Sequence, residues 1–318
     1  MKIVILERNS VGADVSMAPI KAFGDVTEYT DTTPETVAER IADADIVIAN
    51  KLPLNESTLK DAANVKIICE FATGYDNIDT EYCKNRGIAV CNVSGYSTEA
   101  VVQHTFALCF YLLEHLPYYD EYVKSGAYSA QPLFTNYSKH FTELSGKTWG
   151  IVGMGTIGRR VAEVARAFGC RVMYYSTGGN HVVDGYEKVD FETLLAQSDF
   201  VSLHCPLNEK TKYLMDSRAL SIMKPSAILI NVARGKVVNN ADLAAALENK
   251  EIAAAGLDVM EEEPISSDNP LMKIKDSNVL VITPHMAWAS TEARIRCVAE
   301  CAENIKAFLN KESRNRIV

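Results

Sequence analysis

Three kinds of polar side chain stand just beyond short apolar runs in the second half of the chain. They are Arg234, the acidic run Glu261–Glu263, and His285. The carboxyl ends of parallel strands meet at one edge of a sheet, so we expect these side chains to lie together. A guanidinium binds a carboxylate through two charge-assisted hydrogen bonds, and an imidazolium donates a proton near neutral pH. A carboxylate behind the imidazole favours its charged form. The set therefore suits the reversible reduction of a 2-oxo acid.

Each of these residues also has a structural interpretation. Arg234 could be a solvated arginine after a strand, and His285 could be a structural histidine beside Pro284. Spacing alone does not choose among the three consecutive glutamates, any of which could be a solvated acid in an acidic loop.

A glycine motif in the middle of the chain indicates where a cofactor would bind. Gly153, Gly155 and Gly158 have the G-x-G-x-x-G spacing, between an apolar run at 149–152 and a helical pattern that leads to a second run at 171–175. In such a unit one glycine allows the tight turn, one lets the backbone approach a pyrophosphate, and one allows close helix–strand packing. The motif predicts a dinucleotide site, and a bound nicotinamide would supply the hydride.

Apolar runs on both sides of this motif predict an α/β protein with parallel sheets. We expect two domains of the Rossmann-like or flavodoxin-like type with a cleft between them. Residues 1–98 and 287–318 would form a discontinuous substrate domain, and 99–286 the dinucleotide-binding domain. The predicted strands are 2–6, 45–50, 66–71, 88–91, 199–203, 227–231, 253–257 and 279–283.

Two further segments bear on the quaternary structure. A helix from about 97 to 116 is apolar nearly all round and should be buried. Residues 117–146 are rich in aromatic side chains with little periodicity, and we interpret them as an arm that either packs on the domain or crosses to a partner subunit. Together they carry more apolar surface than one small domain covers, which predicts an oligomer.

The composition excludes several classes of function. A formal net charge of -9 argues against nucleic-acid binding, and the absence of an 18-residue apolar stretch predicts no membrane span. The eight cysteines form no C-x-x-C pair, so we expect reduced core thiols, no metal site and a cytoplasmic location. A metal or redox pair at Cys297 and Cys301, one helical turn apart, is the less favoured alternative.

Several motifs together resemble the D-isomer-specific 2-hydroxyacid dehydrogenases over essentially the whole chain. They are G-M-G-T-I-G, S-D-F-V-S-L-H-C-P-L-N-E-K-T, I-N-V-A-R-G, L-D-V-M-E-E-E-P and T-P-H-M-A-W-A-S-T-E-A-R. The resemblance implies that Arg234 binds substrate, that Glu263 orients the histidine, and that His285 is the acid/base. It also implies a two-fold dimer.

The resemblance extends to two loops of the first domain. A-T-G-Y-D-N-I-D implies that the amides of Thr73 and Gly74 hold the substrate carboxylate, and A-N-K-L-P-L places Asn50 and Lys51 at the substrate's far end. A-N-K-L-P-L and H-M-A-W-A-S are most similar to the glycerate dehydrogenase (hydroxypyruvate reductase) branch. The cofactor-binding candidates are Gly153, Gly155, Thr156, Ile157, Gly158, Ser176, His204, Cys205, Pro206, Thr211, Val232, Ala233, Arg234, Asp258, His285 and Ala287.

The chain departs from the family pattern at two positions. Ser176 stands where an NAD-binding unit usually has an acid bonded to the ribose 2′-hydroxyl, and Gln103 stands where the family often has Glu, with no consequence that we can derive. We expect NAD(H) as the cofactor, with a modest preference for NADH and measurable NADPH activity. A strong NADPH preference would require a basic group near Asn180 and His181.

Hydroxypyruvate is the first substrate expectation and glyoxylate the second, because Asn50 and Lys51 suit a hydroxyl better than a branched alkyl chain. The D product is implied by the resemblance alone. The alternatives are a dehydrogenase for a bulkier 2-oxo acid and an NAD-sensing corepressor-like binding protein.

Overall fold

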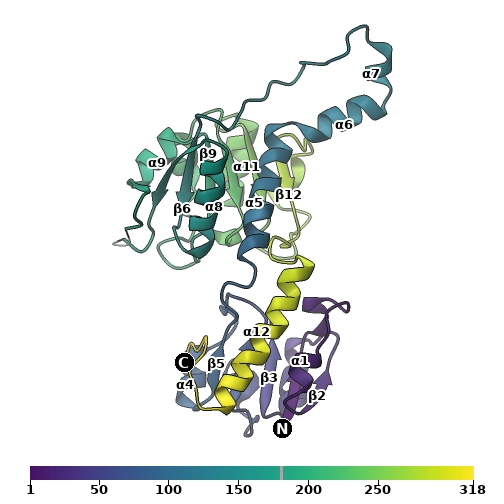
Figure 1. The fold of residues 1–318 in the computed structure, drawn as a ribbon, viewed down its shortest axis with the longest axis vertical. Helices are drawn as coiled ribbons and strands as arrows, with labels where there is room; N and C mark the ends of the chain where they lie inside the picture. The colour runs from purple at the N-terminus through teal and green to yellow at the C-terminus, as the bar shows by residue number, and fades with distance from the viewer. Residues whose placement is uncertain (180–181) are drawn as a thin grey trace. The chain divides into compact units, whose positions relative to one another are not determined.

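The structure is a computed structural model that describes residues 1–179 and 182–318. The chain divides into two compact units (Figure 1). Unit 1 comprises Met1–Ser97 and Trp288–Val318, and unit 2 comprises Thr98–Ala287. Within the described residues, unit 1 contains a five-stranded sheet and unit 2 a seven-stranded sheet, with parallel pairing throughout. The predicted α/β fold class is confirmed.

The sheet of unit 1 has the order β2-β1-β3-β4-β5. The four strands predicted in this part of the chain are present. They could be predicted because strands whose side chains are buried on both faces have continuous apolar runs. The strand β2 was not predicted: it lies at the edge of the sheet and is largely exposed, so it lacks a continuous apolar run. The bounds are β1 (Lys2–Ile5), β2 (Asp25–Glu28), β3 (Ile46–Ala49), β4 (Ile67–Glu70) and β5 (Ala89–Cys91).

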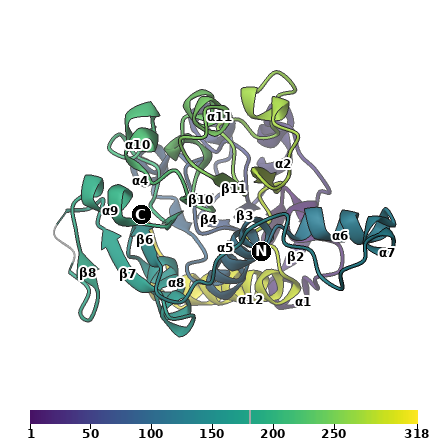
Figure 2. The same ribbon diagram turned by 90° about the horizontal axis from the view of Figure 1, so that it is seen from above.

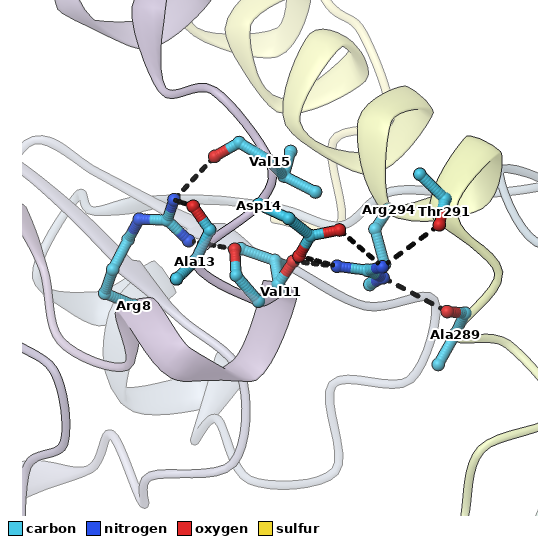
Figure 3. A network of polar contacts seen from close by, with 9 residues as sticks. Arg8, Val11, Ala13, Asp14, Val15, Ala289, Thr291 and Arg294 are labelled. Atoms are coloured by element: carbon cyan, nitrogen blue, oxygen red, sulfur yellow. Dashed lines mark hydrogen bonds and ion pairs between the residues drawn. The ribbon is translucent and has the colours of Figure 1, made fainter.

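The C-terminal helix α12 (Thr291–Leu309) packs in unit 1 against α1 and β4, far from it in sequence. The Nη1 and Nη2 atoms of Arg294 donate to Asp14 Oδ1 (2.6 Å) and Oδ2 (2.9 Å), and Nη1 also donates to the carbonyl of Val11 (Figure 3). This bidentate pair links the first turn of the C-terminal helix to the N-terminal segment of the chain. The other helices of unit 1 are η1 (Arg8–Val11), α1 (Ala18–Lys21), η2 (Pro34–Thr36), α2 (Val37–Ile41), α3 (Glu56–Leu59) and α4 (Thr80–Asn85).

The sheet of unit 2 has the order β12-β11-β10-β9-β6-β7-β8. Figure 2 shows β8 at one end of this sheet beside β7. Trp149 on β6 is fully buried between Phe106 and Phe200, at ring centroid distances of 4.8 and 5.2 Å. The bounds are β6 (Thr148–Val152), β7 (Arg171–Tyr175), β8 (Glu187–Lys188), β9 (Phe200–Leu203), β10 (Ile228–Asn231), β11 (Ala254–Leu257) and β12 (Leu280–Ile282).

The apolar helix α5 (Thr98–Leu113) is buried against β10, β11 and α8, as predicted. The segment expected to be an aperiodic arm begins instead with two helices, which project away from the sheet of their own unit (Figures 1 and 2). The remaining helices of unit 2 are α6 (Leu116–Lys124), α7 (Ala127–Ala130), α8 (Thr156–Ala167), α9 (Phe191–Gln197), α10 (Ser217–Ile222), η3 (Gly235–Val237), α11 (Asn240–Glu248) and η4 (Pro270–Lys273).

Over residues 1–179 and 182–318, no helix combines the length and the apolar character that crossing a membrane requires.

Glu70, at the end of β4, is a charged residue type inside the core of unit 1. Its exposed fraction is 0%, and within the described chain neither carboxyl oxygen has a hydrogen-bond partner. Burial raises the pKa of Glu70 well above its usual value; the nearby Asn77 amide opposes this rise, and Glu7 adds to it. A carboxyl group whose pKa is raised by folding stabilises the fold while protonated. That contribution is lost as pH rises from the unfolded pKa, about 4.3, through the folded pKa.

We therefore predict that Glu70→Gln is more stable than the parent protein at pH 8. The unfolding temperature should rise by about 3 °C or more, because the amide removes the cost of ionising a buried acid. The gain should be smaller at pH 5, measured by differential scanning fluorimetry. The exposed Glu39 on α2 supplies the control, since Glu39→Gln should show no pH-dependent difference. An equal gain for Glu70→Gln at both pH values would contradict the prediction.

Candidate active site

The glycine turn lies between β6 and α8, as the sequence predicts. Gly153 has a φ of +97°, and a Cβ there would stand 2.8 Å from the backbone of His204 and Cys205. A Cβ on Gly158 would stand 2.1 Å from the carbonyl oxygen of Gly153. A Cβ on Gly155 would meet nothing within 4 Å, so the space before α8 is open. The turn therefore fits a pyrophosphate that faces the first N–H groups of α8.

The end of β7 adjoins this turn. The amide of Gly153 donates to the carbonyl of Tyr175 (2.9 Å), and Ser176 follows directly with an exposed fraction of 8%. The amide of Gly179 closes a turn back onto Ser176 (3.1 Å). Asn180 and His181, near which a strong NADPH preference would require a basic group, lie outside the described residues.

The segment after β9 packs behind the glycine turn. Burial lowers the pKa of His204 to about 3, so this histidine is neutral at physiological pH and is not an acid/base candidate. Burial also raises the pKa of Cys205 to about 11. Thr211 is fully buried and its hydroxyl donates to the carbonyl of Pro206 (2.7 Å), so it shapes the loop.

Of the other cofactor candidates, Thr156 and Ile157 begin α8, and Val232 follows β10.

A buried carboxylate organises the turn after β12. Asp258 is 1% exposed and accepts hydrogen bonds from the Thr283 hydroxyl (2.6 Å), the Met286 amide (2.9 Å) and the Ala287 amide (2.8 Å). The amide of His285 donates to the backbone carbonyl of Asp258 (2.8 Å). His285 has a φ of +52°, which is uncommon for a residue other than glycine. These bonds over-determine the turn and keep His285 in that conformation.

Glu263 contacts the imidazole of His285 directly. The Nδ1 atom of His285 lies 2.7 Å from Glu263 Oε2, and the amide of Met260 donates to Glu263 Oε1 (3.0 Å). The His285 and Glu263 side chains are 24% and 35% exposed. The pair leaves Nε2 of the ring as the nitrogen directed away from the carboxylate.

The other two glutamates of the run have different surroundings. Glu261 accepts from the amide of Asn240 at the start of α11 and from the Tyr213 hydroxyl (3.2 Å). Glu262 is exposed. The structure thus separates three residues that spacing alone left equivalent.

The loop that carries Arg234 lies against the acidic loop. The side chain of Asn231 accepts from the Ala233 amide and donates to the Arg234 carbonyl, both at 3.0 Å. A Cβ on Gly235 would stand only 1.8 Å from the carbonyl oxygen of Met260. This backbone contact places the loop after β10 beside the loop that holds Glu263.

His104 belongs to the same network and was missed by the sequence analysis. It lies on α5, and its Nε2 atom is 2.9 Å from the Thr283 hydroxyl and 3.5 Å from Asp258 Oδ1. Burial lowers the pKa of His104, and Asp258 opposes that shift. A lone histidine in an apolar helix was the only signal in the sequence, and core histidines share it.

The candidates in unit 1 lie in loops after β3 and β4. The Glu7 carboxylate accepts from the amides of Asn50 (2.8 Å), Lys51 (3.0 Å) and Leu52 (3.3 Å), so it fixes the first loop. The Thr73 hydroxyl donates to the Val93 carbonyl (2.9 Å), and Gly74 follows it in the second loop.

Within the described residues, no group of three or more His, Cys, Asp or Glu side chains is arranged to hold a metal ion. Cys297 and Cys301 are both buried free thiols.

The chain is similar to several known proteins. Residues 106–287 match the family model described as the NAD binding domain of D-isomer specific 2-hydroxyacid dehydrogenase. A hydroxypyruvate reductase of Blautia hydrogenotrophica is 34% identical, with 97% of each chain covered. A glycerate dehydrogenase of Methylorubrum extorquens is 36% identical, with 99% of this chain and 98% of the relative covered.

A solved structure of an acyclic imino acid reductase in complex with NADPH and D-Arg is also similar, with a TM-score of 0.90, 32% identity and full coverage of both chains. The prediction that the part of the chain with the glycine motif binds a dinucleotide is thus confirmed, because residues 106–287 match an NAD-binding domain. The chain belongs to the D-isomer specific 2-hydroxyacid dehydrogenase family of oxidoreductases.

Proposed function

We propose that this protein reversibly reduces a small 2-oxo acid to the D-2-hydroxy acid with NAD(H). The observation that carries the proposal is the 2.7 Å contact between His285 Nδ1 and Glu263 Oε2, beside the Arg234 loop. A carboxylate behind one ring nitrogen fixes the orientation of the imidazole and stabilises the imidazolium, as in other acid/base pairs.

In this proposal each side chain has one task. Arg234 binds the substrate carboxylate and polarises the adjacent carbonyl. The bound nicotinamide supplies the hydride. His285 Nε2 donates the proton that the new alkoxide needs, and takes it back in the oxidation direction. The amides of Thr73 and Gly74 add to carboxylate binding.

Hydroxypyruvate and glyoxylate are the proposed substrates. The relatives named above and several glyoxylate reductases support a short 2-oxo acid. We propose that Asn50 and Lys51 meet the far end of the substrate, where their polar groups suit a hydroxyl. The hydrogen bonds from this loop to Glu7 support fixed positions for Asn50 and Lys51. A fixed polar group that an apolar substrate leaves unpaired costs affinity.

A substrate panel tests the proposal. We expect kcat/KM for hydroxypyruvate and glyoxylate to exceed that for pyruvate, 2-oxoisocaproate and phenylpyruvate by about tenfold or more, measured by NADH absorbance. A tenfold advantage for a bulky apolar acid would overturn the pocket assignment and leave the reaction type intact. Faster turnover of a 2-oxo acid mixed with an amine would point to an imine as the true substrate. No turnover of any acid, with NADH still bound, would favour a corepressor-like binding protein.

His285→Asn should bind NADH normally and lose about 10² to 10⁴ in kcat, because the alkoxide then lacks its positioned proton donor. Stopped-flow or steady-state kinetics measure the loss, and quenching of protein fluorescence by NADH measures binding. Retention of more than a tenth of the parent kcat would reassign the acid/base.

The two bonded glutamates provide a matched pair of variants. Glu263→Gln should lower kcat by about tenfold to a hundredfold, because the ring loses the charge that holds and stabilises it. Glu261→Gln removes the same charge two residues away, where the carboxylate bonds Asn240 and Tyr213, and should affect stability more than kcat. If Glu261→Gln lowers kcat as much as Glu263→Gln does, the assignment of Glu263 is wrong.

We propose a homodimer formed through the arm. Phe134, Tyr137 and Leu133 are 86%, 70% and 61% exposed, a concentration of apolar surface that a monomer rarely shows. Light scattering should give twice the 35.0 kDa chain mass. The double variant Leu133→Asp/Phe134→Asp should shift the mass toward one chain, whereas Met272→Asp, exposed on η4, should not. A monomeric parent protein at micromolar concentration would reject the dimer.

We also place the protein in the cytoplasm. Its eight cysteines are buried free thiols, and burial raises the pKa of several of them, that of Cys91 to about 12. Unpaired core thiols suit a reducing compartment.

A further inference from the structure

We propose that Lys188 and Lys210 bind the 2′-phosphate of NADP(H) in a cavity at the end of β7, so that the enzyme uses both dinucleotides. The inference rests on the proposed cofactor function of unit 2. It assigns a role to two lysines that are not among the cofactor-binding candidates. Lys210 lies in the motif S-D-F-V-S-L-H-C-P-L-N-E-K-T, and Lys188 lies outside the quoted motifs.

The cavity has a volume of about 720 Å³ and is formed within unit 2. Ser176 and the turn after it form one side, and β8 and the loop after β9 contribute the lysines. The polar and glycine residues that line it are Ser176, Thr177, Gly178, Gly179, Lys188, Asp190 and Lys210.

The cavity begins where the ribose of a dinucleotide would lie. The hydrogen bond from Gly153 to the Tyr175 carbonyl joins the pyrophosphate turn to the end of β7. Ser176 occupies the position at which an acid would bond the ribose hydroxyls and repel a 2′-phosphate. A Cβ on Gly178 or Gly179 would meet nothing within 4 Å, so the turn leaves room for a bulky anion.

Both lysines approach this space from ordered backbone. Lys188 pairs with Tyr174 across the β7–β8 ladder, and its amine donates to the carbonyl of Gly179. The amide of Lys210 donates to the Asn208 side chain (2.9 Å), within the loop that buried Thr211 fixes. One ammonium is therefore held at the turn after Ser176, and the second is carried by the facing loop.

The charged side chains that line the cavity favour the binding of an anion. Among the described residues of the lining, Asp190 is the single carboxylate. It accepts hydrogen bonds from the Thr193 amide (2.8 Å) and hydroxyl (2.6 Å) in the first turn of α9. These bonds lower the pKa of Asp190. Two ammonium groups against one carboxylate leave the cavity with a net positive charge. In place of the modest NADH preference expected from Ser176 alone, we therefore expect NADP(H) to bind more tightly than NAD(H).

Calorimetry with nucleotide fragments tests the inference without turnover. Adenosine 5′-monophosphate and adenosine 2′,5′-bisphosphate differ only in the 2′-phosphate. The parent protein should bind the bisphosphate about tenfold or more tightly than the monophosphate at low salt, and 0.5 M NaCl should reduce that ratio. In the double variant Lys188→Ala/Lys210→Ala the ratio should approach one, with each single variant between the two.

Two further variants keep the result specific. Ser176→Asp should invert the ratio by placing an acid at the 2′ position. Lys273→Ala removes an exposed lysine of η4, outside the cavity lining, and should leave the ratio unchanged. A ratio near one in the parent, or an unchanged ratio in the double variant, would overturn the inference while nucleotide binding itself stands. Failure to bind either fragment would instead refute the proposed cofactor site, and the inference with it.

Discussion

The buried carboxylate of Asp258 is the constraint on which the chemistry of unit 2 depends. Moving an ionised carboxylate out of water costs several kcal/mol unless donors replace the lost hydration. Here one hydroxyl and two backbone amides replace it, and all three come from the five-residue turn that carries His285. Any movement of that turn would leave a buried charge unpaired. The turn thus keeps His285 in the left-handed conformation, because any other conformation would take hydrogen-bond donors away from the buried Asp258 carboxylate.

A second constraint comes from backbone contacts that only glycine permits. Gly235 lets the loop after β10 contact the carbonyl of Met260, the residue directly before the acidic run Glu261–Glu263. The relative placement of Arg234 and Glu263 is therefore set by main-chain packing, which is stiffer than contact between two long side chains. Gly153 does the same between the glycine turn and the segment after β9.

The sequence predicts those features of the fold and the site that depend on neighbouring residues in the chain, and not those that depend on contacts between distant residues. Strands buried on both faces have continuous apolar runs and were predicted, whereas the exposed edge strand β2 and the two-residue β8 have no such run. The family signatures identified Glu263 by its position before Pro264. The hydrogen bonds that separate it from Glu261 join residues more than twenty positions apart, and no local pattern encodes them. The contact between His104 and Thr283 joins residues 179 positions apart, and it could not be predicted for the same reason.

The strand order also distributes charge along the carboxyl edge of the sheet. The acids Asp258, Glu261 and Glu263 follow β11, near one end of the order, whereas Ser176 follows β7, near the other end, where lysines line the cavity. The glycine turn follows β6, between them. A dinucleotide whose pyrophosphate sits at that turn would place its nicotinamide, cationic when oxidised, toward the acids and its adenosine ribose toward the lysines. In the proposed site, the lysines at one end would favour the direction of binding that brings a 2′-phosphate to them, because the reversed cofactor would bring that phosphate toward the carboxylates. In this proposal, the absence of an acid at position 176 would affect the orientation of the cofactor as well as the choice between the two dinucleotides.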